Sequence, residues 1–154
     1  MTQPSTPPEP STVADVMRRD VVTVSPSASI HELVRLLRQH QINGVPVVEE
    51  GRLVGTVSVS DILWLSDARS LYAGDPTERA HAAERMDQRT VREIMSASVF
   101  GVGPEATLAE LATFFARSAL SRAIVQRDGV LLGLVSATDL IELIAKQLAP
   151  RDQA

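Results

Sequence analysis

The sequence predicts an α/β protein made of two copies of one β-α-β-β-α unit. The first observation is self-similarity, because the chain matches itself without a gap at an offset of 78 residues, from Val13 to Leu65 and from Val91 to Leu143. The second is that helix-start signals recur in the same register in both copies. The third is that apolar spacing changes from helical to strand-like within each copy. The matches include Gly and Pro positions, so shared apolar composition does not explain them.

Three helix starts are marked in each copy by a Ser or Thr that precedes an acid by three residues. In this arrangement the hydroxyl accepts a hydrogen bond from an N–H of the first turn, and the acid faces back toward the cap. The second start opens an amphipathic helix, in which apolar residues recur at helical spacing from Ile30 to Leu37 in the first copy. The six starts are Thr12, Ser29 and Ser58, matched by Thr90, Thr107 and Ser136.

Strands are expected between these helix starts. A short strand is expected over 21–24, and the apolar runs 45–48 and 53–57 predict two buried strands. The turn 49–52 joins those two strands in a tight hairpin, and the same turn recurs in the second copy. The strand–helix–strand part should form a right-handed crossover with parallel strands. Pro46 has no N–H to donate, so it should lie at a strand start or a sheet edge.

The remaining segments are expected to lie outside the repeats. Four of the nine prolines fall within the first ten residues, a composition with little to bury. The segment between the repeats predicts an extension of the preceding helix, a turn, and a polar helix near Thr77 to Met86. Its expected role is a solvated connector, with an interaction surface as the second interpretation. The expected division is a disordered tail over 1–11, a first repeat over 12–65, a helical connector over 66–89, a second repeat over 90–148 and a C-terminal tail over 149–154.

Composition argues against several classes of function. The 154 residues carry a net charge of −4, and no basic face marks a nucleic-acid binder. The chain has no Cys, and its three His lack metal-ligand spacing, so no metal site is expected. No apolar run approaches the roughly 20 residues of a membrane helix, and no signal-peptide core is present, so a cytoplasmic protein without membrane contact is expected. No nucleophile with a base and no pair of catalytic acids marks an enzyme.

The densest chemistry follows the last strand of each copy, in residues 55–61 and 133–139. Both segments contain a glycine, two apolar residues, a Ser and, three residues after it, an Asp. The glycine allows another group to approach the strand. One interpretation is helix capping, which contributes about 1 kcal/mol per box. The other is ligand binding, because a carboxylate at a strand end can accept both hydroxyls of a ribose, and helix N–H groups can receive an anion. The two interpretations are compatible.

This pair of motifs, each preceded by a glycine turn between two apolar strands, resembles the cystathionine-β-synthase (CBS) domain pair, often called a Bateman module. The resemblance covers about residues 13–148 and is carried by the double occurrence of the motif in register. It implies two repeats packed about a pseudo-twofold axis, with two clefts that bind adenine nucleotides or related adenosyl ligands. It also implies a regulatory module without catalytic activity and without an obligatory cofactor.

The resemblance assigns ligand-binding residues in two clefts, each of which takes its ribose carboxylate from one repeat and its base and phosphate contacts from the other. Arg122 matches a basic phosphate-binding position, although without the resemblance it is equally well a solvated surface Arg. Gly44 departs from that basic position, and it stays open whether both clefts are occupied. The first cleft would use Ser58, Ser60, Asp61, Leu108, Leu120, Ser121 and Arg122. The second would use Ser136, Thr138, Asp139, Ser25, Ile30, Ile42, Asn43 and Gly44.

The predicted function is therefore that of a ligand sensor that binds an adenosyl compound. The motif does not choose among AMP, ADP, ATP, S-adenosylmethionine, NAD-type or cyclic dinucleotide ligands. The alternative is a ligand-free dimerisation module that acts through protein–protein contacts. A homodimer is expected, with the apolar helices near Ile62 and Ile141 at its seam, because exposed apolar faces usually mark an interface. An effector protein of unknown identity is a further possible partner.

Overall fold

The computed structural model describes residues 10–65, 70 and 74–149, and these form two compact units. The central unit runs from Val22 to Val99. The split unit joins the chain up to Val21 with the chain from Phe100 onward. The predicted terminal tails fall mostly on residues 1–9 and 150–154, and the predicted helix extension falls on 66–69 and 71–73, all outside the described residues.

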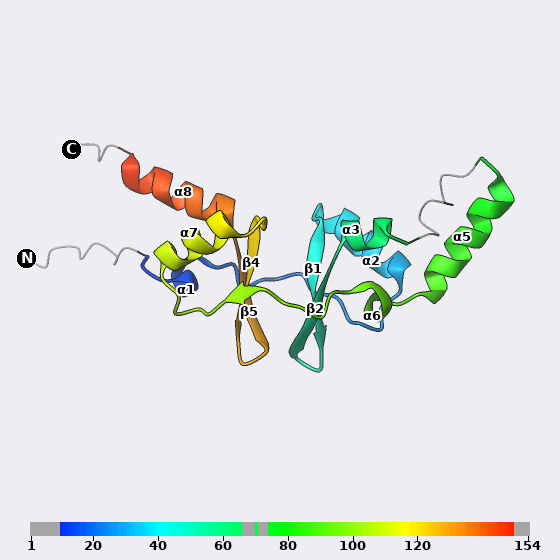
Figure 1. Ribbon diagram of the computed structural model, residues 1–154, viewed down its shortest axis with the longest axis horizontal. Coiled ribbons are helices and arrows are strands. Elements are labelled where there is room, and N and C mark those ends of the chain that lie inside the picture. Colours follow the sequence, from blue (N-terminus) through cyan, green and yellow to red (C-terminus); the bar gives the residue numbers. More distant parts are fainter. Residues whose placement is uncertain (1–9, 66–69, 71–73, 150–154) are drawn as a thin grey trace, which may run out of the picture. The chain divides into compact units, whose positions relative to one another are not determined.

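The central unit is built on a two-stranded antiparallel sheet, in which β1 pairs with β2 (Figure 1). Val24 adds a single parallel bridge to Val47 at the edge of β1. Helix α2 buries Ile30, Leu33 and Leu37 in the core, as the helical spacing predicts. The elements are α2 (Ile30–His40), β1 (Gly44–Glu49), β2 (Arg52–Ser58), α3 (Val59–Leu63), α5 (Pro76–Gln88) and α6 (Val91–Ile94).

The split unit repeats this plan with a three-stranded sheet in the order β3-β4-β5. Strands β3 and β4 are parallel, and β4 and β5 are antiparallel. Helices α7 and α8 contact each other, and α8 also packs against β5 (Figure 1). The elements are α1 (Val13–Val16), β3 (Gly101–Val102), α7 (Leu108–Arg117), β4 (Arg122–Arg127), β5 (Val130–Ser136) and α8 (Ala137–Leu148).

A single proline explains why the two sheets differ at their parallel edge. In the central unit the Val24 N–H donates to the Pro46 carbonyl oxygen. Pro46 has no N–H, so it cannot donate a hydrogen bond back to the segment that contains Val24. In the split unit Ile124 occupies the equivalent position and pairs with Gly101, so β3 forms a strand of two residues. The expected strand over 21–24 is therefore reduced to one bridge, and the prediction that Pro46 lies toward a sheet edge is confirmed.

Both hairpin turns have the predicted tight form. Glu50 and Gly51 have φ values of 49° and 77°, and Asp128 and Gly129 have 53° and 77°. Two consecutive residues with positive φ define a type I′ turn, whose twist suits the two strands that it joins. Glycine at the second position of each turn is therefore required by the backbone conformation.

The short leading helix of each sequence repeat packs into the core formed by the body of the other repeat. Val13 is fully buried in the split unit with Leu111 and Val125, and its N–H donates to the Ala106 carbonyl at 2.8 Å. Val91 is fully buried in the central unit, and its N–H donates to the Ala28 carbonyl at 2.9 Å. Each folded unit therefore contains the leading helix of one sequence repeat and the body of the other.

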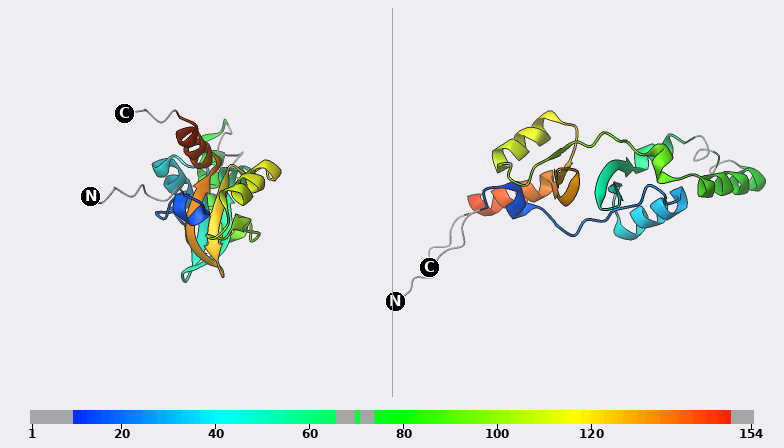
Figure 2. Two further views of the ribbon diagram at one scale, coloured as in Figure 1. Left: turned by 90° about the vertical axis from the view of Figure 1, so that its left-hand side faces the viewer. Right: turned by 90° about the horizontal axis from the view of Figure 1, so that it is seen from below.

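The polar connector contains the predicted helix. Asp75 caps α5 by accepting a hydrogen bond from the Thr77 N–H at 2.7 Å, and a proline occupies the first helical position. Ala82 and Met86 are the buried residues of α5, which contacts α2 near its C-terminal end (Figure 2). The rest of its surface is exposed, as expected for a solvated segment.

Candidate functional site

The two repeated motifs lie where the last strand of each unit runs into its last helix. The Asp61 carboxylate accepts hydrogen bonds through Oδ2 from the N–H and the hydroxyl of Ser58, at 2.7 and 2.8 Å. The Asp139 Oδ2 accepts the same two bonds from Ser136, at 2.8 and 2.6 Å. The capping interpretation is therefore confirmed in both repeats. The residues that follow each Ser by two, Ser60 and Thr138, are exposed beside these carboxylates in the first turn of α3 and α8.

The two carboxylates differ at their second oxygen. Asp139 Oδ1 accepts a hydrogen bond from Arg18 Nη2 at 2.7 Å, which forms an ion pair within the split unit. The repeat partner of Arg18 is Ser96, whose side chain carries no charge. Among the described residues no ion pair or hydrogen bond reaches Asp61 Oδ1. One cap thus keeps an acceptor oxygen available, and the other has both oxygens engaged.

The ion pair shifts the pKa of each partner in the direction that favours its charged form. Burial raises the pKa of Asp139, but hydrogen bonds from Ser136 and Arg18 together outweigh burial and hold the pKa below its usual range. The hydrogen bond to Asp139 and its negative charge raise the pKa of Arg18. The Asp139 side chain is only 15% exposed, against 72% for Arg18, so one partner of the pair is largely shielded from water.

The motif glycines confirm the prediction that another group approaches the strand, and that group is the leading chain of the other repeat. A Cβ on Gly55 would lie 2.5 Å from the Ser96 carbonyl oxygen, and one on Gly133 would lie 2.8 Å from that of Arg18. The approaching chain forms reciprocal backbone hydrogen bonds, at 2.9 Å in both directions between Thr56 and Ser96. Glycine is therefore required here by close backbone packing.

In the central unit, Asn43 and Gly44 lie next to the Asp61 motif. The Asn43 carbonyl accepts a hydrogen bond from the Val59 N–H at 2.8 Å, and Gly44 pairs with Ser58 across the sheet. A Cβ on Gly44 would lie 3.1 Å from the Val57 carbonyl oxygen, so there is little space for a side chain at this point. The structure thus brings these two residues to the motif of their own repeat.

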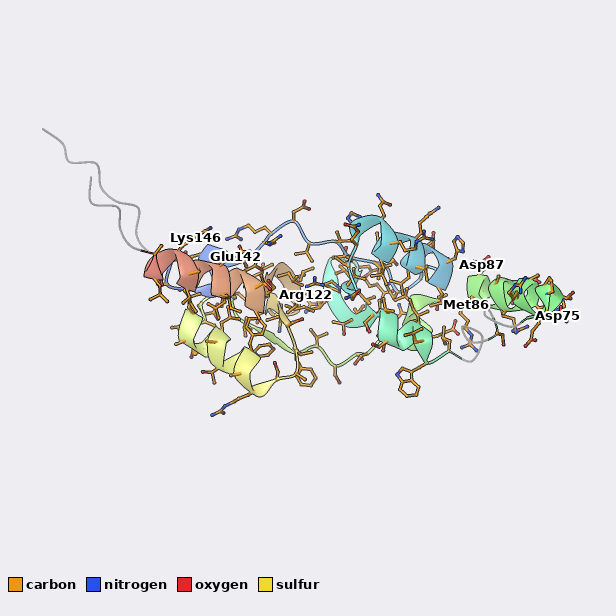
Figure 3. The ribbon with its side chains drawn as sticks, turned by 90° about the horizontal axis from the view of Figure 1, so that it is seen from above. Asp75, Met86, Asp87, Arg122, Glu142 and Lys146 are labelled. Atoms are coloured by element: carbon orange, nitrogen blue, oxygen red, sulfur yellow. The ribbon has the colours of Figure 1, made fainter. Side chains whose placement is uncertain are left out.

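In the split unit, Ser121 and Arg122 lie next to the Asp139 motif in the same way. The Ser121 carbonyl accepts a hydrogen bond from the Ala137 N–H at 2.9 Å, and Arg122 pairs with Ser136. The Arg122 side chain is exposed at the start of β4 (Figure 3). A guanidinium group is therefore accessible at the strand end that carries the second cap.

The remaining predicted residues differ in exposure. Ile30 is fully buried in the central core, whereas its repeat partner Leu108 is half-buried in the first turn of α7. Ile42 is half-buried, and its partner Leu120 is 44% exposed. The Ser25 hydroxyl lies 2.9 Å from a neighbouring serine hydroxyl on an exposed turn. Leu120 and Leu108 thus offer more apolar surface than their counterparts in the first repeat.

Arg18 is the functional candidate that the sequence interpretation missed. It lies 121 residues from Asp139, so no local spacing connects them. The available signal was a break in the repeat, because an identical methionine precedes Arg18 in one copy and Ser96 in the other. Within the described residues no group of three or more His, Asp or Glu suits a metal ion, and no helix there is long and apolar enough to cross a membrane.

The family model of the CBS domain matches residues 13–67 and 91–146, one match on each repeat. The chain belongs to the CBS domain family. It is 31% identical to the CBS domain-containing protein YhcV of Bacillus subtilis over 130 residues, which covers 84% of this chain and 83% of that protein. It is 33% identical over 136 residues to inosine-5'-monophosphate dehydrogenase of Korarchaeum cryptofilum, covering 88% of this chain but spanning only 25% of that enzyme.

Solved CBS structures share the fold. The CBS domain of a CBS domain-containing membrane protein from Sphaerobacter thermophilus has a TM-score of 0.70 and 28% identity, with 88% of each chain covered. The CBS domain pair of protein MJ0100, in complex with 5'-methylthioadenosine and S-adenosyl-L-methionine, has a TM-score of 0.65 and 25% identity, covering 88% of this chain and 97% of that one. The expected α/β fold with tandem CBS repeats is confirmed, and such pairs are typically regulatory and non-catalytic.

Proposed function

We propose that this chain is a regulatory module that binds an adenosyl ligand through the Asp61 motif. The observation that carries the proposal is the Asp61 carboxylate, which is fixed by its cap at Oδ2 while Oδ1 remains an available acceptor. A ribose presents two neighbouring hydroxyl donors, and a carboxylate held in one orientation can accept them. The adenosyl ligands of the MJ0100 CBS pair support this class of ligand.

Arg122 is proposed to contact the phosphate groups of the ligand. Its guanidinium is exposed at the start of β4, and a planar fork of N–H donors suits phosphate oxygens. The proposed base contacts are apolar and include Leu120, which is 44% exposed. The other contacts proposed for this ligand are those that the family resemblance assigns to the Asp61 cleft, namely Ser58, Ser60, Leu108 and Ser121.

Isothermal titration calorimetry of the purified chain with AMP, ATP and S-adenosylmethionine tests this proposal. Asp61→Ala is expected to abolish saturable binding, because it removes the ribose acceptor. The matched control is Glu93→Ala, which removes a cap of the same kind in the same unit, where Glu93 accepts from the Thr90 N–H at 3.0 Å. The control is expected to lose stability but to keep its affinity. If Asp61→Ala binds as tightly as the wild type, the proposed role of this motif is wrong.

We also propose that the chain forms a homodimer through the helices that follow the two motifs. Leu63 on α3 and Ile141 on α8 occupy equivalent repeat positions and are 58% and 64% exposed. Trp64 and Leu148 extend these apolar faces, with exposures of 83% and 79%. Exposed apolar surface of this kind is typical of an interface. Assembly without any ligand is the alternative function, and an unidentified effector protein is the alternative occupant of these faces.

Light scattering at micromolar protein concentration tests the assembly proposal. A homodimer has twice the monomer mass of 16.6 kDa, and Leu63→Glu combined with Ile141→Glu is expected to return it to the monomer mass. A wild-type protein at the monomer mass would contradict the homodimer. A dimer that shows no saturable heat with any of the three adenosyl compounds would instead support assembly as the function.

A further inference from the structure

The two repeats differ at the ion pair between Arg18 and Asp139. Both motifs use Oδ2 of the Asp to receive the two hydrogen bonds of the Ser cap. At Oδ1, the second repeat adds Arg18 Nη2 at 2.7 Å, whereas position 96 of the first supplies only Ser. The difference therefore concerns the oxygen that a ribose needs.

We propose that Arg18 acts as an internal competitor for ribose at Asp139, so that the wild-type chain binds one adenosyl ligand, at Asp61, and leaves the Asp139 motif empty. This inference rests on the proposed function, since it concerns which of two similar motifs accepts the ligand. It makes Arg18 a specificity-determining residue that sets the number of ligands bound per chain.

The strength of the contact favours the arginine over a sugar hydroxyl. The carboxylate makes a charge-assisted hydrogen bond with either donor, but only the guanidinium also brings a full positive charge, which attracts the carboxylate in addition. The Asp139 side chain is 15% exposed, so water screens its charge less than that of a surface acid. A ribose hydroxyl is a neutral donor, and it gains Oδ1 only if the ion pair opens.

A second acid on α8 adds negative charge near the Arg18 guanidinium. Glu142 lies one turn after Asp139 on the same helix, and its negative charge also raises the pKa of Arg18 (Figure 3). The residue equivalent to Glu142 in the first repeat is Trp64. The second repeat therefore supplies two carboxylates to a cation that the first repeat lacks, which is consistent with closure of one motif only.

The backbone at Arg18 does not depend on its side chain. The Arg18 N–H and carbonyl exchange hydrogen bonds with Leu134 at 2.8 and 2.9 Å, and Ser96 exchanges the same pair with Thr56 at 2.9 Å in both directions. Serine is thus already accommodated at this position in the other repeat. Because the Arg18 side chain is 72% exposed, its replacement opens no cavity.

The test is a reciprocal exchange of the two residues, followed by calorimetric titration with AMP. The wild type is expected to bind one AMP per chain, and Arg18→Ser is expected to bind two. The second site of Arg18→Ser should be lost on adding Asp139→Ala. Ser96→Arg is expected to weaken binding at Asp61 by tenfold or more, because the new guanidinium then competes for Asp61 Oδ1.

Arg19→Ser is the matched control for the loss of charge. The Arg19 guanidinium donates only to the Ala14 carbonyl, at 3.4 Å, and touches neither carboxylate. This variant is expected to keep one AMP per chain. The melting temperatures of all variants are measured alongside, so that affinities are compared on folded protein.

Three results separate the inference from the proposed function. If the wild type binds AMP and Arg18→Ser still binds one per chain, the inference is wrong and the proposed function stands. If Arg18→Ser binds AMP more weakly than the wild type, Arg18 contacts the ligand and is not a competitor. If the wild type binds none but Arg18→Ser binds one, Arg18 does close the Asp139 motif, and the proposed use of Asp61 is wrong.

Discussion

Replacing Gly55 by alanine should destabilise the protein far more than a single methyl group normally does. The new Cβ would lie 2.5 Å from the Ser96 carbonyl oxygen and 3.2 Å from the sulfur of the neighbouring methionine. Because the nearest atom belongs to the backbone, the chain around Ser96 must move, and the two hydrogen bonds that Thr56 shares with it are stretched or lost. Each bond contributes about 1 kcal/mol and overpacking costs about 1–3 kcal/mol, so the expected loss is about 3–5 kcal/mol.

Urea unfolding followed by far-ultraviolet circular dichroism measures this loss. Tryptophan fluorescence is a poor probe here, because Trp64 is 83% exposed in the chain and lies on the proposed dimer face, so its signal would mix dissociation with unfolding. Gly74→Ala is the control, since a Cβ at that position meets nothing within 4 Å. The control should change stability by less than about 0.5 kcal/mol. A Gly55→Ala protein as stable as this control would refute the role given to the glycine.

Three further predictions concern binding, turn geometry and pH. Arg122→Ala should weaken ATP binding about tenfold or more in calorimetry and leave adenosine binding unchanged, because the contact is to phosphate; equal losses for both ligands would argue against it. Glu50→Asn should raise the unfolding free energy by about 0.5–1 kcal/mol, because the φ of 49° before Gly51 suits Asn better than Glu, and Glu50→Gln should not. Backbone and hydroxyl hydrogen bonds from Ser29 lower the pKa of Glu32 in the folded chain. The stability that they contribute is therefore fully present above the ordinary pKa of 4.5, and it is lost as the pH falls through the lowered pKa of the folded chain. Glu32→Gln keeps the box and should show a smaller loss of stability between about pH 5 and pH 3 in urea unfolding, and an unchanged loss would contradict this assignment.

Local signals were sufficient to predict most of the secondary structure. The capping boxes at Ser29 and Thr107 were identified because hydroxyl and acid stand three residues apart, and both form the expected hydrogen bonds. The tight hairpin turns are predicted because short polar segments with Gly51 and Gly129 separate apolar runs, and the structure gives both turns the type I′ form. In each case the residues that determine the structure are close together in the chain.

Contacts between distant segments were beyond the reach of these signals. The repeat shows that Val13 and Val91 are equivalent, but equivalence does not determine which copy of the core receives each of them. The ion pair of Arg18 with Asp139 joins residues 121 positions apart, and a surface arginine has many possible partners. The candidate carboxylates were therefore predicted from the sequence, and the difference between them required the structure.

The exchange of leading helices has the form of a domain-swapped dimer whose two protomers are joined into one chain. The contacts are reciprocal, because Val13 donates to Ala106 and Val91 donates to Ala28, which are the equivalent carbonyls of the two copies. A single repeat cut out at its sequence boundaries would lose the valine that fills its core and would expose its own. Each half of the chain therefore supplies a core residue that the other half needs in order to fold.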